Sequence, residues 1–420
     1  MHIKMLTIKE LFQNICALKF AFDSLFARIA AGIAQLYGIR VFLGNYSQDE
    51  YSTIIIVLGL SPIFLLFEFG ISQTIQNIFN QRKCSAASII KIMMFHYIII
   101  LFIGLALSQS VFIPALVLNE SLLNATNIQI FTIGSMLLVI SSNNVILHKV
   151  LLLLRKGQLI NILILVTSVM QILGLYIYNK IGASNPVFSI IIFLSPILFI
   201  SFVALVWIGA IAFTKKTIDK SFVKNNFFKT SSSFFIINIM LALLLTLDYI
   251  VLSFYGATNQ IASYHTVNRF FLISYTLYAS YLNFAAKKIS NTKQISIIHQ
   301  VRISTNLIGT ICVTGVFVLL VILKETKGIN LISDNLVLSY ALLFSGFIYF
   351  LIRVFADTNI LLAKNQSQKG LAFMVYFIEI LLASILMVYF FPIYGEISLF
   401  ISLAIAYSIG NLFYLMLVKK

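Results

Sequence analysis

Residues 187–213 read VFSIIIFLSPILFISFVALVWIGAIAF and contain no charged side chain. A run of about 20 apolar residues is long enough for an α-helix to cross the hydrocarbon core of a bilayer. Similar runs recur along the whole sequence, at roughly 20–43, 51–78, 88–110, 128–150, 158–179, 232–256, 264–286, 302–323, 336–361, 371–391 and 396–418. The sequence therefore predicts an all-α polytopic membrane protein with about twelve transmembrane helices.

The composition supports the same fold class. Of the 420 residues, 60% are hydrophobic and 10% are charged, whereas a soluble domain carries about 25% charged residues. The connections between the predicted spans are short and leave no room for a soluble domain. The three cysteines lie far apart in the sequence, which fits neither a disulfide framework nor a metal site.

The positive charge is distributed unevenly between the two sides of the membrane. With the N-terminus inside, most of the 29 Lys and Arg residues fall in cytoplasmic segments, and the outer segments hold only Arg40, Lys180, Lys324 and Lys327. The positive-inside rule therefore predicts that both termini are cytoplasmic. This topology and the anionic headgroups of the inner leaflet explain the net charge of +16, so no nucleic-acid partner is expected.

Two six-helix bundles are expected. The segments 36–51 and 247–264 both run from an apolar helix end through a glycine and a short polar turn to a tyrosine that opens the next helix. Because both segments face outward in the predicted topology, the bundles are expected to be parallel repeats about an axis along the membrane normal. The predicted division is an N-terminal bundle at 1–213, a basic cytoplasmic linker at 214–231 and a C-terminal bundle at 232–420.

Charged side chains inside the predicted spans are the first candidates for function, because a charge at mid-bilayer costs roughly 2.5–3.5 kcal/mol on insertion scales. These residues are Asp23, Arg28, Glu68, Asp248, Arg269, Arg353, Asp357 and Glu379. Each is expected to face the interior of the bundle or water.

Arg28 is the main candidate for lining a cavity. It shares one helical face with Ala31, Gln35 and Ser24, so we expect this stripe to border a water-filled space. Asp23 lies more than one helical turn away on another face, and its shallow position makes simple solvation an equal explanation for its charge.

Other buried charges have structural alternatives. Arg353 and Asp357 are spaced i, i+4 on one helix and could neutralise each other. Asp248 and Arg269 could pair across helices, or they could line the outer half of a transport path. Glu379 has no obvious local partner, which suits a protonatable group.

Uncharged polar groups and prolines also occur within the spans. The block at 141–144 (SSNN) is expected to hydrogen-bond between helices, and His96 is expected to be structural. Pro62 and Pro196 are expected to interrupt their helices.

Sequence motifs for enzyme chemistry are absent. The chain has no Gly-rich loop followed by Lys and Ser or Thr, no cluster of His, Cys and carboxylates at metal spacing, and no arguable Ser-His-Asp set. We therefore expect a protein without enzymatic activity, metal site or cofactor.

Four parts of the chain resemble one family of transporters. Residues 42–51 (FLGNYSQDEY) are similar to a Leu-Gly, polar turn and Tyr step out of the first span, and 65–72 (LLFEFGIS) to an acidic-aromatic-Gly element of the second. The segment 247–264 is similar to an Asp-containing seventh span, and Arg353 and Asp357 resemble charged positions of the tenth. This family is the Wzx flippases of bacterial O-antigen and related polysaccharide assembly, within the MATE-like (MOP) superfamily.

The resemblance implies a fold of two MATE-like bundles and an inner-membrane flippase. Its substrate would be an oligosaccharide repeat unit on undecaprenyl pyrophosphate, moved from the cytoplasmic to the periplasmic leaflet by alternating access. Membrane lipids, H⁺ or Na⁺, and other polysaccharide-assembly proteins are the further partners that it implies. Arginine suits the phosphates because guanidinium donates two parallel hydrogen bonds. The expected cavity residues are Arg28, Arg269, Arg353 and Asp248, and the expected ion-coupling residues are Asp23, Glu68, Asp357 and Glu379.

Two alternatives stay open at this point. Acids outnumber bases within the predicted spans, which is a departure from a cationic cavity and would suit an ion-coupled antiporter of drugs or small organic cations. A membrane-embedded polysaccharide polymerase would be an enzyme, and it would carry a large periplasmic loop with arginines that this sequence lacks.

Overall fold

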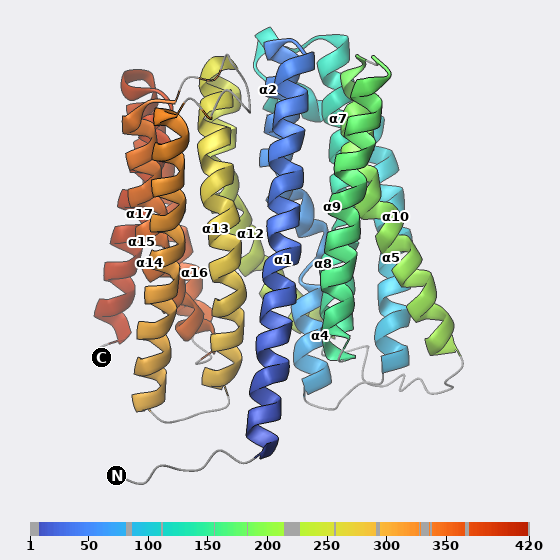
Figure 1. Ribbon diagram of the computed structural model, residues 1–420, viewed down its shortest axis with the longest axis vertical. Coiled ribbons are helices and arrows are strands. Elements are labelled where there is room, and N and C mark those ends of the chain that lie inside the picture. The colour runs from blue at the N-terminus through green and yellow to red at the C-terminus, as the bar shows by residue number, and fades with distance from the viewer. Residues whose placement is uncertain are drawn as a thin grey trace.

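The computed structural model of the chain is helical throughout the part that it describes (Figure 1). The described residues are 8–80, 86–110, 112–154, 156–182, 184–213, 227–255, 258–290, 295–326, 328, 336, 338–365 and 369–418. Most of the predicted linker therefore lies outside the described residues. No strand occurs in the described ranges, in agreement with the all-α fold class.

The helices in chain order are α1 (Ile8–Asn45), α2 (Gln48–Gly59), α3 (Ser61–Leu65), the 3₁₀ turn η1 (Leu66–Glu68), α4 (Ile71–Asn80), α5 (Ala86–Ser108), α6 (Phe112–Val117), the 3₁₀ turn η2 (Glu120–Leu122), α7 (Ala125–Ser141), α8 (Asn143–Leu153), α9 (Gly157–Lys180), α10 (Pro186–Phe213), α12 (Phe227–Tyr255), α13 (Thr258–Ser290), α14 (Ile295–Glu325), α15 (Tyr340–Asn365), α16 (Lys369–Tyr394) and α17 (Ile397–Val418).

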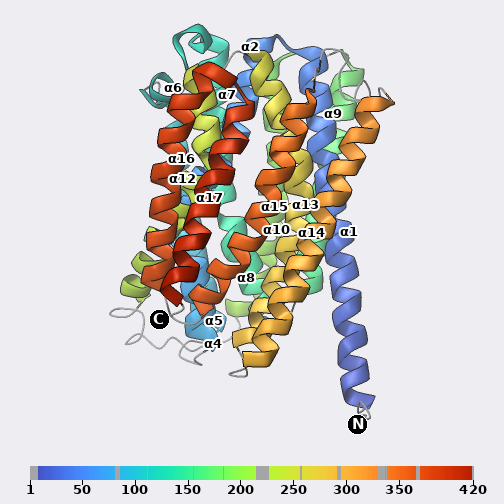
Figure 2. The ribbon, with the colours of Figure 1, turned by 90° about the vertical axis from the view of Figure 1, so that its left-hand side faces the viewer.

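Eleven of the helical stretches in the described residues are long and apolar enough to cross a membrane. The remaining long helix, α13, has 33 residues and is more polar, with Asn268, Arg269 and His265 on its turns. It nevertheless runs the height of the bundle between α14 and α1 in Figure 1, and it lies beside α14 in Figure 2 as well. With α13 included, the predicted twelve-helix membrane fold is confirmed.

Two of the spans are broken. The second span is divided into α2, α3, η1 and α4, and the fourth is divided at Ser142 into α7 and α8. Pro62 lies in the first turn of α3 and has no N–H, so it cannot donate to the carbonyl of Leu58. The prediction that Pro62 interrupts its helix is therefore confirmed. The same prediction for Pro196 was wrong, because α10 continues through it; membrane helices often accommodate proline.

The second break of the second span lies next to a close contact with α12. Phe69 and Gly70 both have positive φ values, 52° and 70°. A Cβ atom on Gly70 would lie 2.6 Å from the carbonyl oxygen of Ser231 on α12. Glycine is therefore required both by the backbone conformation and by the approach of the neighbouring helix.

The helices form two packed groups, which we call the N-half (α1–α10) and the C-half (α12–α17). The extensive contacts between the groups involve only α12 and α13 of the C-half, which pack against α1, α2, α3, η1, α4 and α6. Figure 1 shows α1 beside the C-half, next to α13. We call this line of contact the seam.

The first and last helices place the two ends of the chain on one side. α1 begins and α17 ends at the lower end of the bundle in Figure 1, as an even number of crossings requires. We call this the inner end, because the charge bias of the sequence predicts that it faces the cytoplasm.

Candidate functional site

A cavity of about 320 Å³ lies in the N-half. Its walls come from α1, α2, α3, α7, α8, α9 and α10, and α13 of the C-half closes it. Polar side chains face it from several walls, among them Gln35 of α1, His148 of α8 and Gln171 of α9. His265 and Arg269 of α13 complete the lining. Among the described residues, no carboxylate lines this space.

The polar wall is held in place by hydrogen bonds between helices. Gln171 on α9 donates to the carbonyl of Phe193 on α10 at 2.8 Å. Ser201 on α10 bonds to the side-chain oxygen of Asn144 on α8. In both bonds, one helix supplies the hydrogen-bond acceptor for a side chain on another helix. These side chains therefore bond to the protein and leave the cavity open. The prediction that the block at 141–144 bonds between helices is confirmed for Asn143, which bonds to His96, and for Asn144. It is wrong for Ser141, which donates to the carbonyl of Leu138 in its own helix.

His96 belongs to the same packing but lies outside the cavity. Its two ring nitrogens bond to the side-chain oxygen of Asn143 and to the carbonyl of Phe67, both at 2.8 Å. The ring therefore ties α5 to α8 and to the broken second span. Its predicted structural role is confirmed.

Arg269 is the basic residue on the cavity wall. Its Nε donates to Nε2 of His265 at 3.2 Å, and one terminal nitrogen donates to the carbonyl of Leu58 at 3.2 Å. That carbonyl is the one left without an intrahelical donor by Pro62. A guanidinium from the C-half thus binds the break in the second span of the N-half.

Arg28 lies on the predicted stripe but one turn away from the cavity lining. Ala31 and Gln35 line the cavity, while the Nε of Arg28 donates to Ser24 at 3.4 Å. Arg28 lies within electrostatic range of His148, which belongs to the wall. Arg28 is therefore a neighbour of the cavity, and its predicted contact with substrate stays a prediction.

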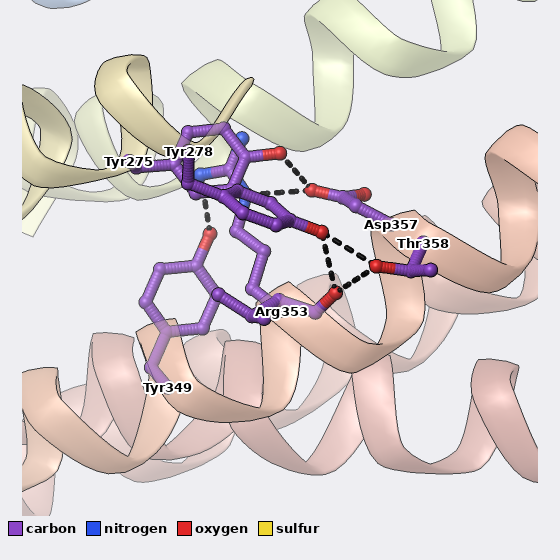
Figure 3. A network of polar contacts seen from close by, with 7 residues as sticks. Tyr275, Tyr278, Tyr349, Arg353, Asp357 and Thr358 are labelled. Atoms are coloured by element: carbon purple, nitrogen blue, oxygen red, sulfur yellow. Dashed lines mark hydrogen bonds and ion pairs between the residues drawn. The ribbon is translucent and has the colours of Figure 1, made fainter. Parts of the chain in front are cut away.

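Arg353 and Asp357 lie elsewhere, in the interior of the C-half (Figure 3). The Nε of Arg353 is 3.3 Å from a carboxylate oxygen of Asp357, so the predicted mutual neutralisation is confirmed. The guanidinium also stacks 4.1 Å from the ring centre of Tyr275 and donates to the hydroxyl of Tyr349 at 3.1 Å. Tyr275 in turn donates to Asp357. Arg353 is only 5% exposed, and it does not line the cavity.

Asp248 is also buried in the C-half. It accepts from the hydroxyl of Tyr264 at 2.5 Å, from the backbone N–H of Tyr249 at 2.9 Å and from Asn268 at 3.4 Å. The sequence allowed a direct ion pair between Asp248 and Arg269, but the structure does not form one. The hydrogen bonds that connect the two groups run through Asn268, Tyr249 and His265.

The other predicted acids also stay away from the cavity. Glu68 lies at the seam, in the η1 turn before α4. It accepts from the side-chain nitrogen of Asn238 on α12 at 3.1 Å and from the backbone of Ser72 at 3.2 Å. Glu379 is fully buried between α16 and α17, against Gly410. Asp23 is half-buried on α1 and does not line the cavity.

The structure therefore keeps the predicted acids away from the cavity, although Arg353 is enclosed with three of them in the C-half. Arg269 and the histidines His148 and His265 lie on the cavity, with Arg28 close by. The C-half encloses three of the acids, at positions 248, 357 and 379, and the seam holds Glu68. This arrangement favours an anion in the cavity.

Sequence reasoning missed both cavity histidines. His265 precedes Arg269 by one helical turn, so the pair was visible as i, i+4 neighbours on one face. His148 follows the polar block of the fourth span at the same spacing from Asn144. A search for polar residues at helical spacing, rather than for charges alone, would have included them.

Comparison with known proteins gives two distant relatives. No family model matches the chain. The chain is 24% identical over 270 residues to a protein of Yersinia pseudotuberculosis named as an O-antigen export protein, and the alignment covers 61% of each chain, less than two thirds of that relative. It is 22% identical over 400 residues to a Salmonella typhi protein named as an O-antigen transporter, across 91% of this chain and 90% of that protein. The resemblance to polysaccharide exporters is confirmed.

Solved structures give the fold. The lipid II flippase MurJ in an inward closed conformation superposes with a TM-score of 0.68 at 18% identity, over 96% of this chain and 88% of MurJ. An inward-facing multidrug resistance MATE transporter of the MOP superfamily superposes with a TM-score of 0.66 at 10% identity, over 94% and 98% of the two chains. The chain is a multi-pass membrane protein with the fold of these transporters.

Proposed function

We propose that this protein is an inner-membrane flippase for an oligosaccharide repeat unit carried on undecaprenyl pyrophosphate. It moves the saccharide from the cytoplasmic to the periplasmic leaflet by alternating access of the two halves. The observation that supports this most is the cavity of the N-half, which is lined by an arginine and two histidines and, in the described residues, by no acid.

The chemistry of such a substrate matches this cavity. A pyrophosphate diester is anionic at neutral pH, and guanidinium binds it with parallel charge-assisted hydrogen bonds. Amide and hydroxyl side chains on the walls, such as Gln35 and Gln171, suit the hydroxyl groups of a sugar. The polyprenyl tail is as apolar as the lipid, so it can remain in the bilayer while the head crosses.

The size of the cavity indicates that the halves must move. About 320 Å³ is at the low end for small-molecule sites, which measure roughly 300–1,000 Å³. A lipid-linked oligosaccharide needs more room than this. Contacts across the seam, such as that of Asn238 with Glu68, are therefore expected to break when the cavity opens inward.

The two alternatives fit less well. An antiporter of organic cations would place carboxylates on the cavity, whereas the described acids are enclosed in the C-half or lie at the seam. The relatives are named as export and transport proteins, which is consistent with transport and not with polymerisation. A proton or Na⁺ as driving ion belongs to the proposal, with Glu68, Asp357 and Glu379 as candidate carriers and Asp23 as a solvated one. Cooperation with other polysaccharide-assembly proteins belongs to it as well.

Deletion of the gene in its native host tests the proposal. We expect loss of surface polysaccharide and accumulation of the lipid-linked repeat unit on the cytoplasmic leaflet, with restoration by the wild-type gene. Normal surface polysaccharide in a deletion strain that has no second flippase would overturn the proposal.

A further inference from the structure

The hydrogen bonds around Arg269 fix the protonation of its neighbour. Arg269 has only donors, so its Nε–H must meet a bare nitrogen on His265, and the nitrogen that it meets is Nε2 at 3.2 Å. A neutral imidazole carries one proton. That proton must therefore sit on Nδ1 of His265.

The partner of Nδ1 agrees with this assignment. Nδ1 lies 2.7 Å from the hydroxyl oxygen of Tyr249, which can accept its proton. The same oxygen accepts from the side-chain nitrogen of Asn268 at 3.3 Å, and that nitrogen also lies 3.4 Å from a carboxylate oxygen of Asp248. The hydrogen bonds thus run from the buried carboxylate of Asp248 on α12 to Asn268, and from Asn268 through Tyr249 and His265 to the guanidinium on the cavity.

The hydrogen bonds between Tyr249, His265 and Arg269 are shielded from water by burial. His265 is 1% exposed and Tyr249 is 2% exposed, so water does not compete for their hydrogen bonds. The ring of Tyr249 packs directly on Gly59 of α2, where a Cβ atom would lie 2.2 Å from the ring. Leu58 precedes Gly59, and its carbonyl accepts the second hydrogen bond of Arg269.

These two anchors leave part of Arg269 for a ligand. Guanidinium has five N–H groups, and the anchors at His265 and Leu58 use one each. The remaining N–H groups belong to the two terminal nitrogens, which form the fork that binds phosphate with two parallel bonds. Arg269 lines the cavity, so a fork held in this way faces an incoming anion at little cost in side-chain entropy.

We infer that His265 is a positioning residue for anion binding, held by Tyr249 in its Nδ1-protonated form so that it accepts from Arg269 and aims the guanidinium at the cavity. The inference rests on the proposed function for the identity of the ligand, a pyrophosphate diester. The position of the proton on His265 is independent of that function.

The first experiment measures the proton directly. The chain has only five histidines, so ¹⁵N-histidine labelling of the protein in lipid nanodiscs gives few signals, and the spectrum of His265→Gln assigns one of them. We expect the ¹⁵N shifts of His265 to show a protonated Nδ1 and a bare Nε2. A protonated Nε2 would overturn the inference whatever the protein transports.

The second experiment measures affinity for undecaprenyl-pyrophosphoryl-N-acetylglucosamine in the same nanodiscs. Glutamine carries an oxygen near the position of the imidazole Nε2 and can still accept from Arg269, whereas alanine cannot. We expect His265→Gln to bind within about threefold of wild type and His265→Ala to lose about tenfold, the equivalent of one hydrogen bond. Equal affinities for wild type and His265→Ala, or equal losses in both variants, would overturn the inference.

Tyr249→Phe provides a variant of conserved shape in case His265→Ala does not fold. It removes the acceptor for Nδ1–H, so we expect the proton signal of His265 to shift and the affinity to fall. Tyr278→Phe is the matched control, because it removes a buried tyrosine hydroxyl that bonds to Thr358 and the carbonyl of Val354, remote from Arg269. Equal losses of affinity in both Phe variants would show a general packing effect and overturn the inference.

Absence of binding by wild type itself would count against the proposed function, while the proton measurement would still decide the role of His265.

Discussion

At the scale of single residues, Arg28 is the sharpest prediction that the sequence alone supplied. Arg28→Ala is expected to reduce export by about tenfold to a hundredfold, as for a lost charge-assisted hydrogen bond, with protein levels in the membrane near wild type. Arg28→Lys is expected to recover part of the activity, because an ammonium keeps the charge and loses the planar fork. Export of surface polysaccharide at matched protein level measures both. Full activity of Arg28→Ala would remove the contact, and loss of the protein from the membrane would give Arg28 a structural role instead.

Gly59 supports a second prediction at this scale. A Cβ atom there would meet the buried ring of Tyr249 at 2.2 Å, so Gly59→Ala is expected to destabilise the protein by about 1–3 kcal/mol through overpacking and to displace Tyr249 from His265. Gly315→Ala on α14 is the control, because no atom lies within 4 Å of its Cβ position. Thermal unfolding in nanodiscs measures the difference. A neutral Gly59→Ala would contradict the close packing of α2 on α12.

The sequence predicted candidate site residues only where a charged residue interrupts an apolar run. Arg269 was selected in this way and lies on the cavity. Arg353 was selected by the same rule, yet it is enclosed by aromatic rings, because tertiary packing and not the sequence decides which way a helix face turns. His265 was overlooked because a neutral polar residue in a membrane helix is common.

At the scale of elements, the break in the second span is the feature that links sequence to site. Pro62→Ala is expected to restore an N–H donor to the carbonyl of Leu58, straighten the span and deprive Arg269 of one anchor. Export is therefore expected to fall while thermal stability is kept or raised. Because both changes act on one interaction, the losses from Pro62→Ala and Arg269→Gln are expected to be less than additive in the double variant. Fully additive losses would contradict the link between the break and Arg269.

The helices themselves were predictable, because long apolar runs have few other solutions in a bilayer. The break at Pro62 followed from a missing donor. The break at Phe69 and Gly70 was not predicted, because it depends on the approach of α12, and a single sequence does not show which helices approach. The break at Ser142 was not predicted either, because no proline marks it in the sequence.

At the scale of the whole molecule, the topology and the two-bundle division remain predictions with direct tests. Reporter fusions at Lys420 and within 214–231 are expected to read cytoplasmic, because most basic residues lie on that side. A periplasmic result at either site would reverse the orientation. Spans one to six and seven to twelve are also expected to superpose by rotation about the membrane normal, and a match only after inversion would contradict the parallel repeat.

In the proposed function, the cavity of the N-half carries the anionic head of a lipid-linked saccharide across the bilayer. Reconstitution in proteoliposomes with undecaprenyl-pyrophosphoryl-N-acetylglucosamine tests it most directly, with accessibility of the sugar to an external enzyme as the measure of its leaflet. Wild-type protein is expected to make the inner-leaflet lipid accessible, and Arg269→Gln is expected to slow this by about tenfold or more. Equal rates with wild-type protein and with empty liposomes, given both an imposed proton gradient and a sodium gradient, would contradict the claim.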